Sequence, residues 1–264
     1  MEKIYYIPTD RKMICLTFDD GPNDPTTPII LEILKTHNIK ATFFVLVENA
    51  MKNPAIMEAV IREGHTIGLH GYNHKSFNTY PKLKTYRHIK RCLEIMEQQF
   101  GVQTAYFRPP YGTFPDCAET IANEFNLTPV GWSLMEADWK PSMSRLKTKN
   151  ILARCSLGKI VVLHDGYRHY THVGTTIENL QQMLPPLISS GYSFVSIPEL
   201  VAAKTQLQSK VLNGIPLLHR EIVDLSQSTV LFLYWDINYI DQTKKYMCPT
   251  CGSEFERCLF ELQV

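Results

Sequence analysis

The chain has 264 residues, of which 44% are hydrophobic and 20% charged, and this is enough for one large globular domain with or without a small appendage. A formal net charge of +1 argues against nucleic acid or a membrane surface as a partner, because both attract strongly basic proteins. No stretch approaches the roughly 18 consecutive apolar residues of a membrane-spanning helix. Residues 1–8 lack the apolar core of a signal peptide, so we expect a cytoplasmic protein.

Strand-like and helix-like segments alternate between residues 12 and 203. Apolar and β-branched runs predict strands at residues 13–16, 41–47, 66–69, 105–107, 128–134, 159–163 and 192–197. Helical periodicity, proline starts and glycine stops predict helices at residues 29–37, 54–63, 83–100, 116–125, 145–155, 176–188 and 198–203. Pro185 and Pro186 are expected to interrupt the sixth of these helices. About seven strand–helix repeats indicate an α/β fold with a parallel sheet, either flat or closed into a barrel.

Polar residues stand directly after the predicted strands. Asp19 and Asp20 end the first strand, and two adjacent acids on a strand cannot both be hidden in one apolar core, because they point to opposite faces. Four later strands are followed by His70, Arg108, Asp138 and His164. Barrel active sites are built at the C-terminal ends of several strands, whereas a doubly wound sheet gathers its ligand residues near one switch point. Polar groups at five strand ends therefore favour a barrel of about seven strands.

Two histidines suggest a metal site. His70 and His74 lie four residues apart, so one helical turn or a tight loop can aim both imidazoles at one point. Two neutral imidazoles and one carboxylate form a common catalytic zinc site, which leaves positions open for water and substrate. Two histidines at this spacing, taken alone, are more often unrelated polar residues. The acids at the end of the first strand, with the arginine and the second histidine stretch at other strand ends, favour a metal site. His65 precedes its strand and is expected at the opposite end.

Three further residues each allow two interpretations. Arg108 lies in a proline-stiffened loop, where it either holds a carboxylate in a bidentate grip and orients it or is a surface arginine of a turn. Trp139 either stacks on the face of a sugar or belongs to the core. His164 ends the apolar run 160–163 and is either a core histidine or a general acid that faces the mouth of the barrel. The residues alone leave these alternatives open.

Five segments occur in a fixed order, and they read TFDDGP at 17–22, HGYNH at 70–74, RPPY at 108–111, DW at 138–139 and VLHD at 162–165. Together they resemble the five ordered motifs of the polysaccharide deacetylases, the NodB-homology domain of carbohydrate esterase family 4. The match covers residue 12 to about residue 203. The resemblance implies a distorted (β/α) barrel that removes N-acetyl groups from an N-acetylglucosamine-containing glycan, of the chitooligosaccharide or peptidoglycan type, and releases acetate.

The resemblance also implies a divalent metal, with zinc expected first and cobalt, nickel or manganese as alternatives. It implies these roles: Asp20, His70 and His74 as metal ligands, Asp19 as general base oriented by Arg108, His164 as general acid tuned by Asp138, Tyr111 as backbone donor to the oxyanion, and Trp139 and Val162 as the lining of the acetyl pocket. One residue departs from the family pattern, because Met135 stands where the fourth motif usually begins with another acid. This departure puts the local hydrogen bonding in doubt.

Two rival functions remain open. The first is a superfamily relative that hydrolyses a cyclic amide or imide, although such relatives often vary the acidic pair and the first histidine motif, which are intact here. The second is a catalytically silent glycan-binding module, which the retention of every implied catalytic residue argues against. Acetate release together with a metal assay would distinguish all three functions. Chain-length preference and oligomeric state do not follow from the sequence.

The strand–helix alternation stops at about Lys204, so we divide the chain into a deacetylase-like domain at 1–203 and a C-terminal appendage at 204–264. Cys248 and Cys251 have the spacing of half a structural zinc site, and Cys258 would supply a third thiolate. No fourth ligand is close in sequence, so a tight turn with reduced cysteines is the alternative. The other cysteines are expected to be reduced, and those inside predicted elements are Cys15, Cys92, Cys117 and Cys155.

We expect the appendage to lie outside the chemistry, as a docking or oligomerisation element. Truncation after about Ala203 should therefore leave acetate release from small oligosaccharides largely intact. The measurement compares acetate released by the truncated and full-length chains at equal concentration. A soluble, folded, metal-binding truncation without activity would instead make the appendage part of the active site.

Overall fold

The structure is a computed structural model that describes residues 3–114, 116–135, 138, 144–166 and 174–204. Its contacts divide the chain into two units at residues 1–205 and 206–264. The second unit lies outside the described residues, and so do Trp139 and the cysteines at 248, 251 and 258. The expected appendage and its zinc ligands therefore stay predictions.

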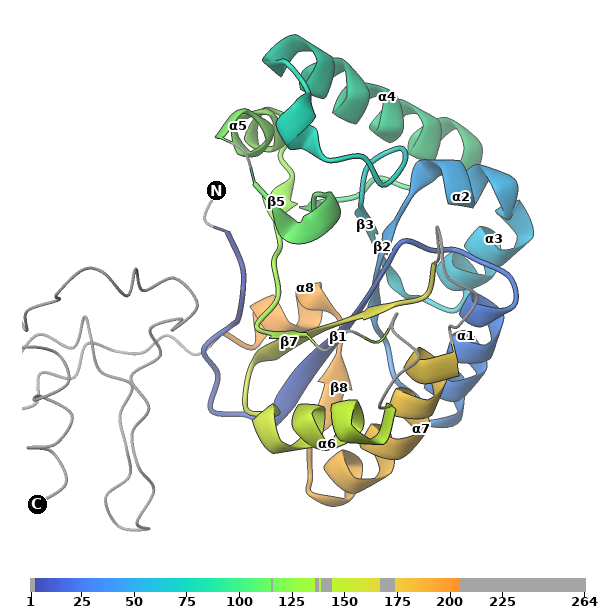
Figure 1. The fold of residues 1–264 in the computed structure, drawn as a ribbon, viewed down its shortest axis with the longest axis vertical. Coiled ribbons are helices and arrows are strands. Elements are labelled where there is room, and N and C mark those ends of the chain that lie inside the picture. The colour runs from blue at the N-terminus through green and yellow to red at the C-terminus, as the bar shows by residue number, and fades with distance from the viewer. Residues whose placement is uncertain (1–2, 115, 136–137, 139–143, 167–173, 205–264) are drawn as a thin grey trace, which may run out of the picture. The chain divides into compact units, whose positions relative to one another are not determined.

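A curled sheet of parallel strands forms the centre of the first unit (Figure 1). The strands are β1 (Met13–Asp19), β2 (Thr42–Val45), β3 (Thr66–Leu69), β4 (Tyr106–Phe107), β5 (Thr128–Pro129), β6 (Leu134–Met135), β7 (Lys159–His164) and β8 (Ser193–Val195). They pair in the order β5-β4-β3-β2-β1-β7-β6, and β8 pairs with β1. Strand β7 covers one edge of β1, while β8 and β2 share the other edge. This arrangement confirms the distorted (β/α) barrel.

Helices surround the curled sheet (Figure 1). They are α1 (Thr26–Thr36), α2 (Val47–Lys52), α3 (Pro54–Arg62), α4 (Lys82–Phe100), α5 (Asp116–Glu124), α6 (Ser144–Arg154), α7 (Gly174–Ser189) and α8 (Ile197–Ala202). Seven of the eight were expected from the sequence, with ends that differ by a few residues. Among the described residues, none of these helices has the length and apolarity that crossing a membrane requires.

The two faces of the sheet are both buried, but they differ in character. Along β1 the side chains of Ile14, Leu16 and Phe18 belong to the outer core between sheet and helices. The alternate residue Cys15 packs in an inner cluster with Phe44 of β2, as well as residues from β7, β8 and α8. Because side chains alternate along a strand, Thr17 and Asp19 share the inner face of β1. The inner face thus changes from apolar to polar towards the C-terminal strand ends.

Residues 128–134 do not form the single strand that was expected. They form two short strands, β5 and β6, and the segment between them steps across the opening of the curled sheet. The backbone N–H of Val130 bonds to Phe107 O at 2.8 Å, and that of Ser133 bonds to Ile160 O at 3.0 Å. The N–H of Gly131 bonds to Ile4 O at 2.7 Å. These three N–H groups bond to three different segments of the chain. The residues therefore cannot pair as one continuous strand with a single neighbour, which explains the break.

Two helices also differ from expectation. Helix α7 continues through Pro185 and Pro186, both of which lie on its exposed side, while Leu184 and Leu187 are buried in the core. Water can satisfy the carbonyls that lose their donors on that side, so the helix survives. Helix α2 was not expected, because its six residues are too few for a periodic signal. The cysteines at 15, 92, 117 and 155 are free thiols.

Candidate active site

Asp20 directly follows β1, at the C-terminal strand ends, and it adopts a left-handed backbone with φ of 77°. This conformation is uncommon for a residue with a side chain, so its neighbours must hold it. Its carbonyl accepts a hydrogen bond from Nδ2 of Asn49 at 2.7 Å. The next carbonyl, that of Gly21, accepts from the N–H of Leu46 at 3.0 Å. Asn49 of α2 and Leu46, which joins β2 to α2, thus fix the backbone of the turn that carries Asp20.

His70 and His74 come from the loop after β3 and face the same carboxylate. Oδ1 of Asp20 lies 3.4 Å from Nε2 of His70 and 3.4 Å from Nε2 of His74. Nδ1 of His70 lies 2.7 Å from the backbone O of Arg108, which can only accept a hydrogen bond. Nδ1 therefore carries a proton, which leaves Nε2, on the side of Asp20, as the nitrogen that can bind a metal. The resulting fixed tautomer suits a metal ligand.

The three residues form a candidate metal site. Their ligand atoms all lie within 4.8 Å of one another. Burial lowers the pKa of His74, so its imidazole is neutral, although the charge of Asp20 opposes this. Burial raises the pKa of Asp20, but the neighbouring imidazoles of His70, His74 and His164 outweigh it and the net pKa is lowered. Oδ1 of Asp20 is buried without a hydrogen-bond partner, and a divalent cation would satisfy it.

Asp19 and Arg108 form a buried ion pair beside this site. Asp19 is 3% exposed, and its Oδ1 lies 2.6 Å from NH1 of Arg108. The grip is not bidentate, because the other donors of the guanidinium bond to Val130 O and Gly131 O, and NH1 also bonds to Thr17. Oδ2 of Asp19 remains on the side of the metal site, 4.0 Å from Nε2 of His70. One carboxylate oxygen is thus fixed and the other faces the reaction space.

The partly buried His164 pairs with the fully buried Asp138. Oδ1 of Asp138 lies 2.8 Å from Nδ1 of His164, and Oδ2 accepts the His164 backbone N–H at 2.8 Å. Thr176 donates to Oδ2 at 2.6 Å and Thr175 donates to the Asp138 carbonyl. Burial lowers the pKa of His164, but attraction to Asp138 outweighs it and raises the value to about 9. His164 is therefore protonated at neutral pH.

Asp165, for which the sequence predicts no role, is completely buried next to the turn that carries Asp20. Its Oδ1 accepts the Gly21 N–H at 3.0 Å, and its Oδ2 accepts the Thr27 hydroxyl at 2.7 Å. Burial raises the pKa of Asp165 to about 7, and repulsion from Asp20 adds to the shift. A Cβ on Gly21 would lie 2.0 Å from its Oδ2. The available signal was an acid directly after His164 at a strand end.

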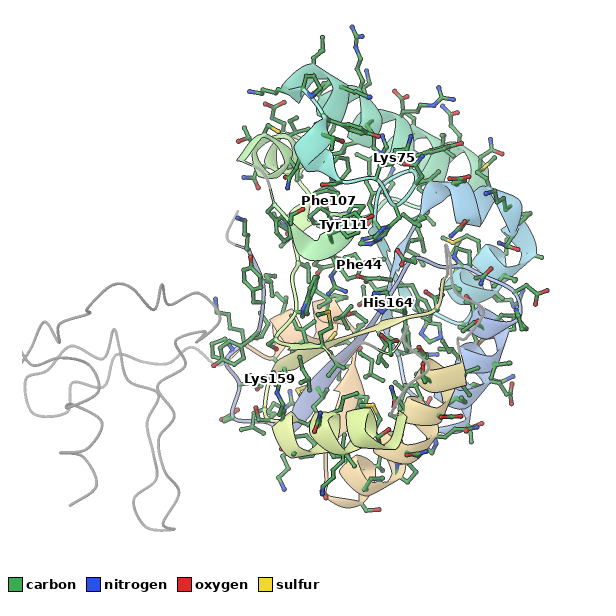
Figure 2. All side chains as sticks on the ribbon, viewed as in Figure 1. Phe44, Lys75, Phe107, Tyr111, Lys159 and His164 are labelled. Carbon is green, nitrogen blue, oxygen red and sulfur yellow. The ribbon has the colours of Figure 1, made fainter. Side chains whose placement is uncertain are left out.

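The remaining predicted residues take these positions. Tyr111 has φ of 64° and a 62% exposed side chain, and its ring lies 4.4 Å from that of His74. Val162 is buried on β7, opposite Met135 of β6. Figure 2 shows His164 and Lys159 at the two ends of β7, with Tyr111 on the side of His164.

His65 stands at the start of β3, away from the site, and its Nδ1 accepts the Ala41 N–H at 3.2 Å. The catalytic roles assigned from the sequence stay predictions.

Comparison with known proteins identifies relatives of this arrangement. The polysaccharide deacetylase family model matches residues 6–130. The chain is 37% identical to the peptidoglycan-N-acetylglucosamine deacetylase PgdA of Listeria monocytogenes over 197 residues. The aligned region covers 75% of this chain and 40% of that protein. The chain therefore spans less than half the length of that relative.

Two solved structures share the fold. A peptidoglycan N-acetylglucosamine deacetylase aligns with a TM-score of 0.71 and 33% identity, covering 75% of this chain and 92% of that chain. A carbohydrate esterase family 4 pseudoenzyme from Bacillus anthracis aligns with a TM-score of 0.70 and 26% identity, covering 76% of this chain and 69% of that chain. Because the second is described as a pseudoenzyme, activity has to be argued from the site rather than from the fold.

We expect Asp20→Asn and His74→Ala each to abolish metal retention, because each removes one of only three ligands. Elemental analysis of the purified, folded variants measures the metal bound per chain. Asp24→Asn is the matched control, since Asp24 is an exposed acid four residues away and should leave metal content unchanged. Stoichiometric metal in a folded His74→Ala protein would show that this ligand set is wrong.

Proposed function

Because the chain belongs to the polysaccharide deacetylase family, we propose that it is a metal-dependent hydrolase that removes N-acetyl groups from an N-acetylglucosamine-containing glycan. One observation carries the proposal. A candidate metal site, a carboxylate with one free oxygen and a protonated histidine meet at the C-terminal ends of β1, β3 and β7. These are the groups that hydrolysis of an amide requires.

A peptidoglycan-type glycan is the first candidate substrate, and a chitooligosaccharide is the second. The first is supported by relatives named as peptidoglycan N-acetylglucosamine deacetylases, at 37% and 33% identity. The sugar, its chain length and the acetyl position are left to the assay. Localisation in the cytoplasm stays a prediction.

Zinc is the metal that we propose, because one carboxylate and two imidazoles are a common ligand set for catalytic zinc. Cobalt, nickel or manganese would fit the same donors. When bound, the cation supplies Lewis-acid polarisation of the amide carbonyl. Asp20, His70 and His74 would hold it, and no further side chain is needed to complete a catalytic set of three ligands.

Asp19 acts as the general base. Its Oδ1 is fixed by Arg108, so its Oδ2 is free to accept a proton from the attacking water. Arg108 donates to four different acceptors and packs against the ring of Phe44, with Cζ 4.1 Å from the ring centroid. The base is therefore held on a rigid support, and proton transfer needs no rearrangement of the chain.

His164 acts as the general acid. Its Nδ1 is engaged by Asp138, so the proton on Nε2 is the one that can pass to the leaving amine. The N–H of Tyr111 is proposed to donate to the oxyanion, and Val162, with Trp139, to line the acetyl pocket. Acetate and a free amine leave the site.

A catalytically silent glycan-binding module is one alternative function, because a similar solved structure is described as a pseudoenzyme. The intact Asp19 pair, metal set and His164 pair argue for an active enzyme. A cyclic amide or imide hydrolase is the other rival, and the same residues argue against it because the acidic pair and both histidines are present.

The test is acetate release from peptidoglycan fragments and from chitooligosaccharides by the zinc-loaded chain. We expect release with at least one of them, and a loss of about 10²–10⁴-fold in Asp19→Asn, the usual span for positioned proton transfer. Metal content should stay parental in this variant, because Asp19 is not a ligand. A metal-loaded parent without acetate release, but with glycan binding, would establish the silent module.

The pH dependence tests the acid. His164 must be protonated, so the rate should fall as pH rises through its pKa, which the structure raises to about 9. A bound cation would repel the proton of His164 and lower its pKa, so the rate would then fall at a lower pH. Asp138→Asn removes the attraction, so the basic limb of the pH–rate profile should move down by about one unit or more. Superimposable basic limbs in parent and variant would remove the Asp138–His164 pair from the mechanism.

A further inference from the structure

The loop between the two metal-ligand histidines is held from two sides. On one side, the carbonyls of Gly71 and Tyr72 accept hydrogen bonds from the N–H groups of Val47 and Glu48, at 3.0 and 2.8 Å, in the first turn of α2. On the other side, the N–H of Tyr72 donates to Nε2 of His88 at 2.9 Å. Tyr72 is midway between His70 and His74, so both anchors act on the residue that connects the two ligands.

We propose that His88 of α4 is a positioning residue for the metal centre: its imidazole fixes the backbone of Tyr72 and thereby sets how His70 and His74 present their Nε2 atoms. This inference rests on the metal site of the proposed function. His88 has no role predicted from the sequence, because it lies within a helix and belongs to none of the five segments.

The surroundings of His88 keep its ring in one orientation. The ring centroid lies 5.3 Å from that of Phe77, in an edge-to-face contact at 86°, and 5.6 Å from that of Tyr80. The ring of Tyr72 itself contacts it edge-on at 6.5 Å. A side chain packed among three aromatic rings has little rotamer freedom, so the acceptor atom stays where the Tyr72 N–H needs it.

The protonation state also fits this role. Nε2 accepts a hydrogen bond, so it holds a lone pair and the proton of the neutral ring is on Nδ1. Burial lowers the pKa of His88 to about 4, and the charge of Lys84, one turn earlier on α4, adds to the effect. His88 thus remains an acceptor throughout the neutral range.

The loop needs such an anchor because its first residue is a glycine. Gly71 has φ of +99°, a conformation that side chains rarely adopt, and the chain reverses there directly after His70. A Cβ at this position would lie 3.5 Å from Nε2 of His88 and 3.5 Å from Cζ of Phe77. These are ordinary van der Waals distances, so the backbone conformation, and not a lack of space, is what requires glycine. Glycine adds backbone freedom to the loop, and the hydrogen bond from the Tyr72 N–H to His88 reduces it.

The chain contains a matched control in His65. It is also largely buried, accepts a backbone N–H, from Ala41, and lies edge-on to a phenylalanine, with its centroid 5.1 Å from that of Phe43. Burial lowers its pKa to about 4 as well. It differs in place, because it stands at the opposite end of β3 from the metal site. Effects of losing a buried histidine in general should therefore appear equally at His65.

The experiment measures the dissociation constant for zinc ion by competition with a chelator, using the full chain freed of metal. The variants are His88→Phe, which keeps an aromatic ring but cannot accept the N–H, His88→Gln, whose amide oxygen can accept it, and His65→Phe. His88→Ala repeats the measurement if the phenylalanine is not accommodated. The melting temperature of each metal-free variant records any general loss of stability.

We expect His88→Phe to weaken zinc binding about tenfold or more, the lower end of the range for residues that orient metal ligands. His88→Gln should stay within about threefold of the parent, and His65→Phe should keep the parental constant even if its melting temperature falls. Parental zinc affinity in a folded His88→Phe or His88→Ala protein would overturn the inference, and so would an equal loss in His65→Phe. A parent that binds no zinc would instead overturn the proposed metal site, and this inference with it.

Discussion

A fully buried guanidinium is the constraint on which the site depends. Arg108 is completely inaccessible to water, and burial lowers its pKa while the charge of Asp19 opposes the change. An arginine remains charged in proteins, so its charge and its donors have to be matched inside the barrel. Asp19 supplies the charge, and Thr17, Val130 and Gly131 supply the other acceptors. Removing one member of such a pair typically costs about 3–5 kcal/mol, because the other is left buried and uncompensated.

The same residue connects the parts of the site. Its guanidinium spans from β1 to the segment between β5 and β6, so it ties together the two sides of the opening in the curled sheet. Its backbone carbonyl accepts the proton of His70 Nδ1 and sets the tautomer of the first imidazole ligand. Gly68 makes room for this arrangement, because a Cβ there would lie 2.4 Å from the ring of Phe44 on which the guanidinium packs. One buried residue therefore orients the proposed base through its side chain and a candidate metal ligand through its backbone carbonyl, and it joins two parts of the barrel wall.

The proposed general acid, His164, is held in a similar way by Asp138. Asp138 is itself fully buried, and it receives hydrogen bonds from Thr176 and from both the ring and the backbone of His164. Asp165 supports the turn that carries Asp20 by accepting the Gly21 N–H. Asp19, Asp20 and His164 are thus each held by a buried partner that does not itself react in the proposed mechanism. Catalytic groups on a rigid scaffold need little reorganisation during the reaction, which is the physical advantage of this design.

Several differences between expectation and structure have the same origin. The segment 128–134 divides into two strands because its backbone donors bond to Phe107, Ile4 and Ile160, which are remote in sequence. Arg108 was expected to bind a carboxylate through two parallel hydrogen bonds, but it contacts only one oxygen of Asp19. Its other N–H groups donate to the backbone carbonyls of Val130 and Gly131. Helix α2 is too short for a periodic signal, and its first N–H groups are satisfied by Gly71 and Tyr72, in the loop between the candidate ligands His70 and His74. None of these partners can be read from a local pattern.

The sequence by itself determined the alternation of strands and helices, the polar residues at the strand ends and the five ordered segments, because these are local patterns of hydrophobicity and residue type. It therefore predicted the curled barrel and the candidate ligands Asp20, His70 and His74. Only the tertiary structure decided which oxygen of Asp19 is free, which nitrogen of His70 carries the proton, and that His88 and Asp165 support the metal loops. Those features depend on hydrogen bonds between segments far apart in the chain, and such contacts exist only once the barrel has closed around Arg108.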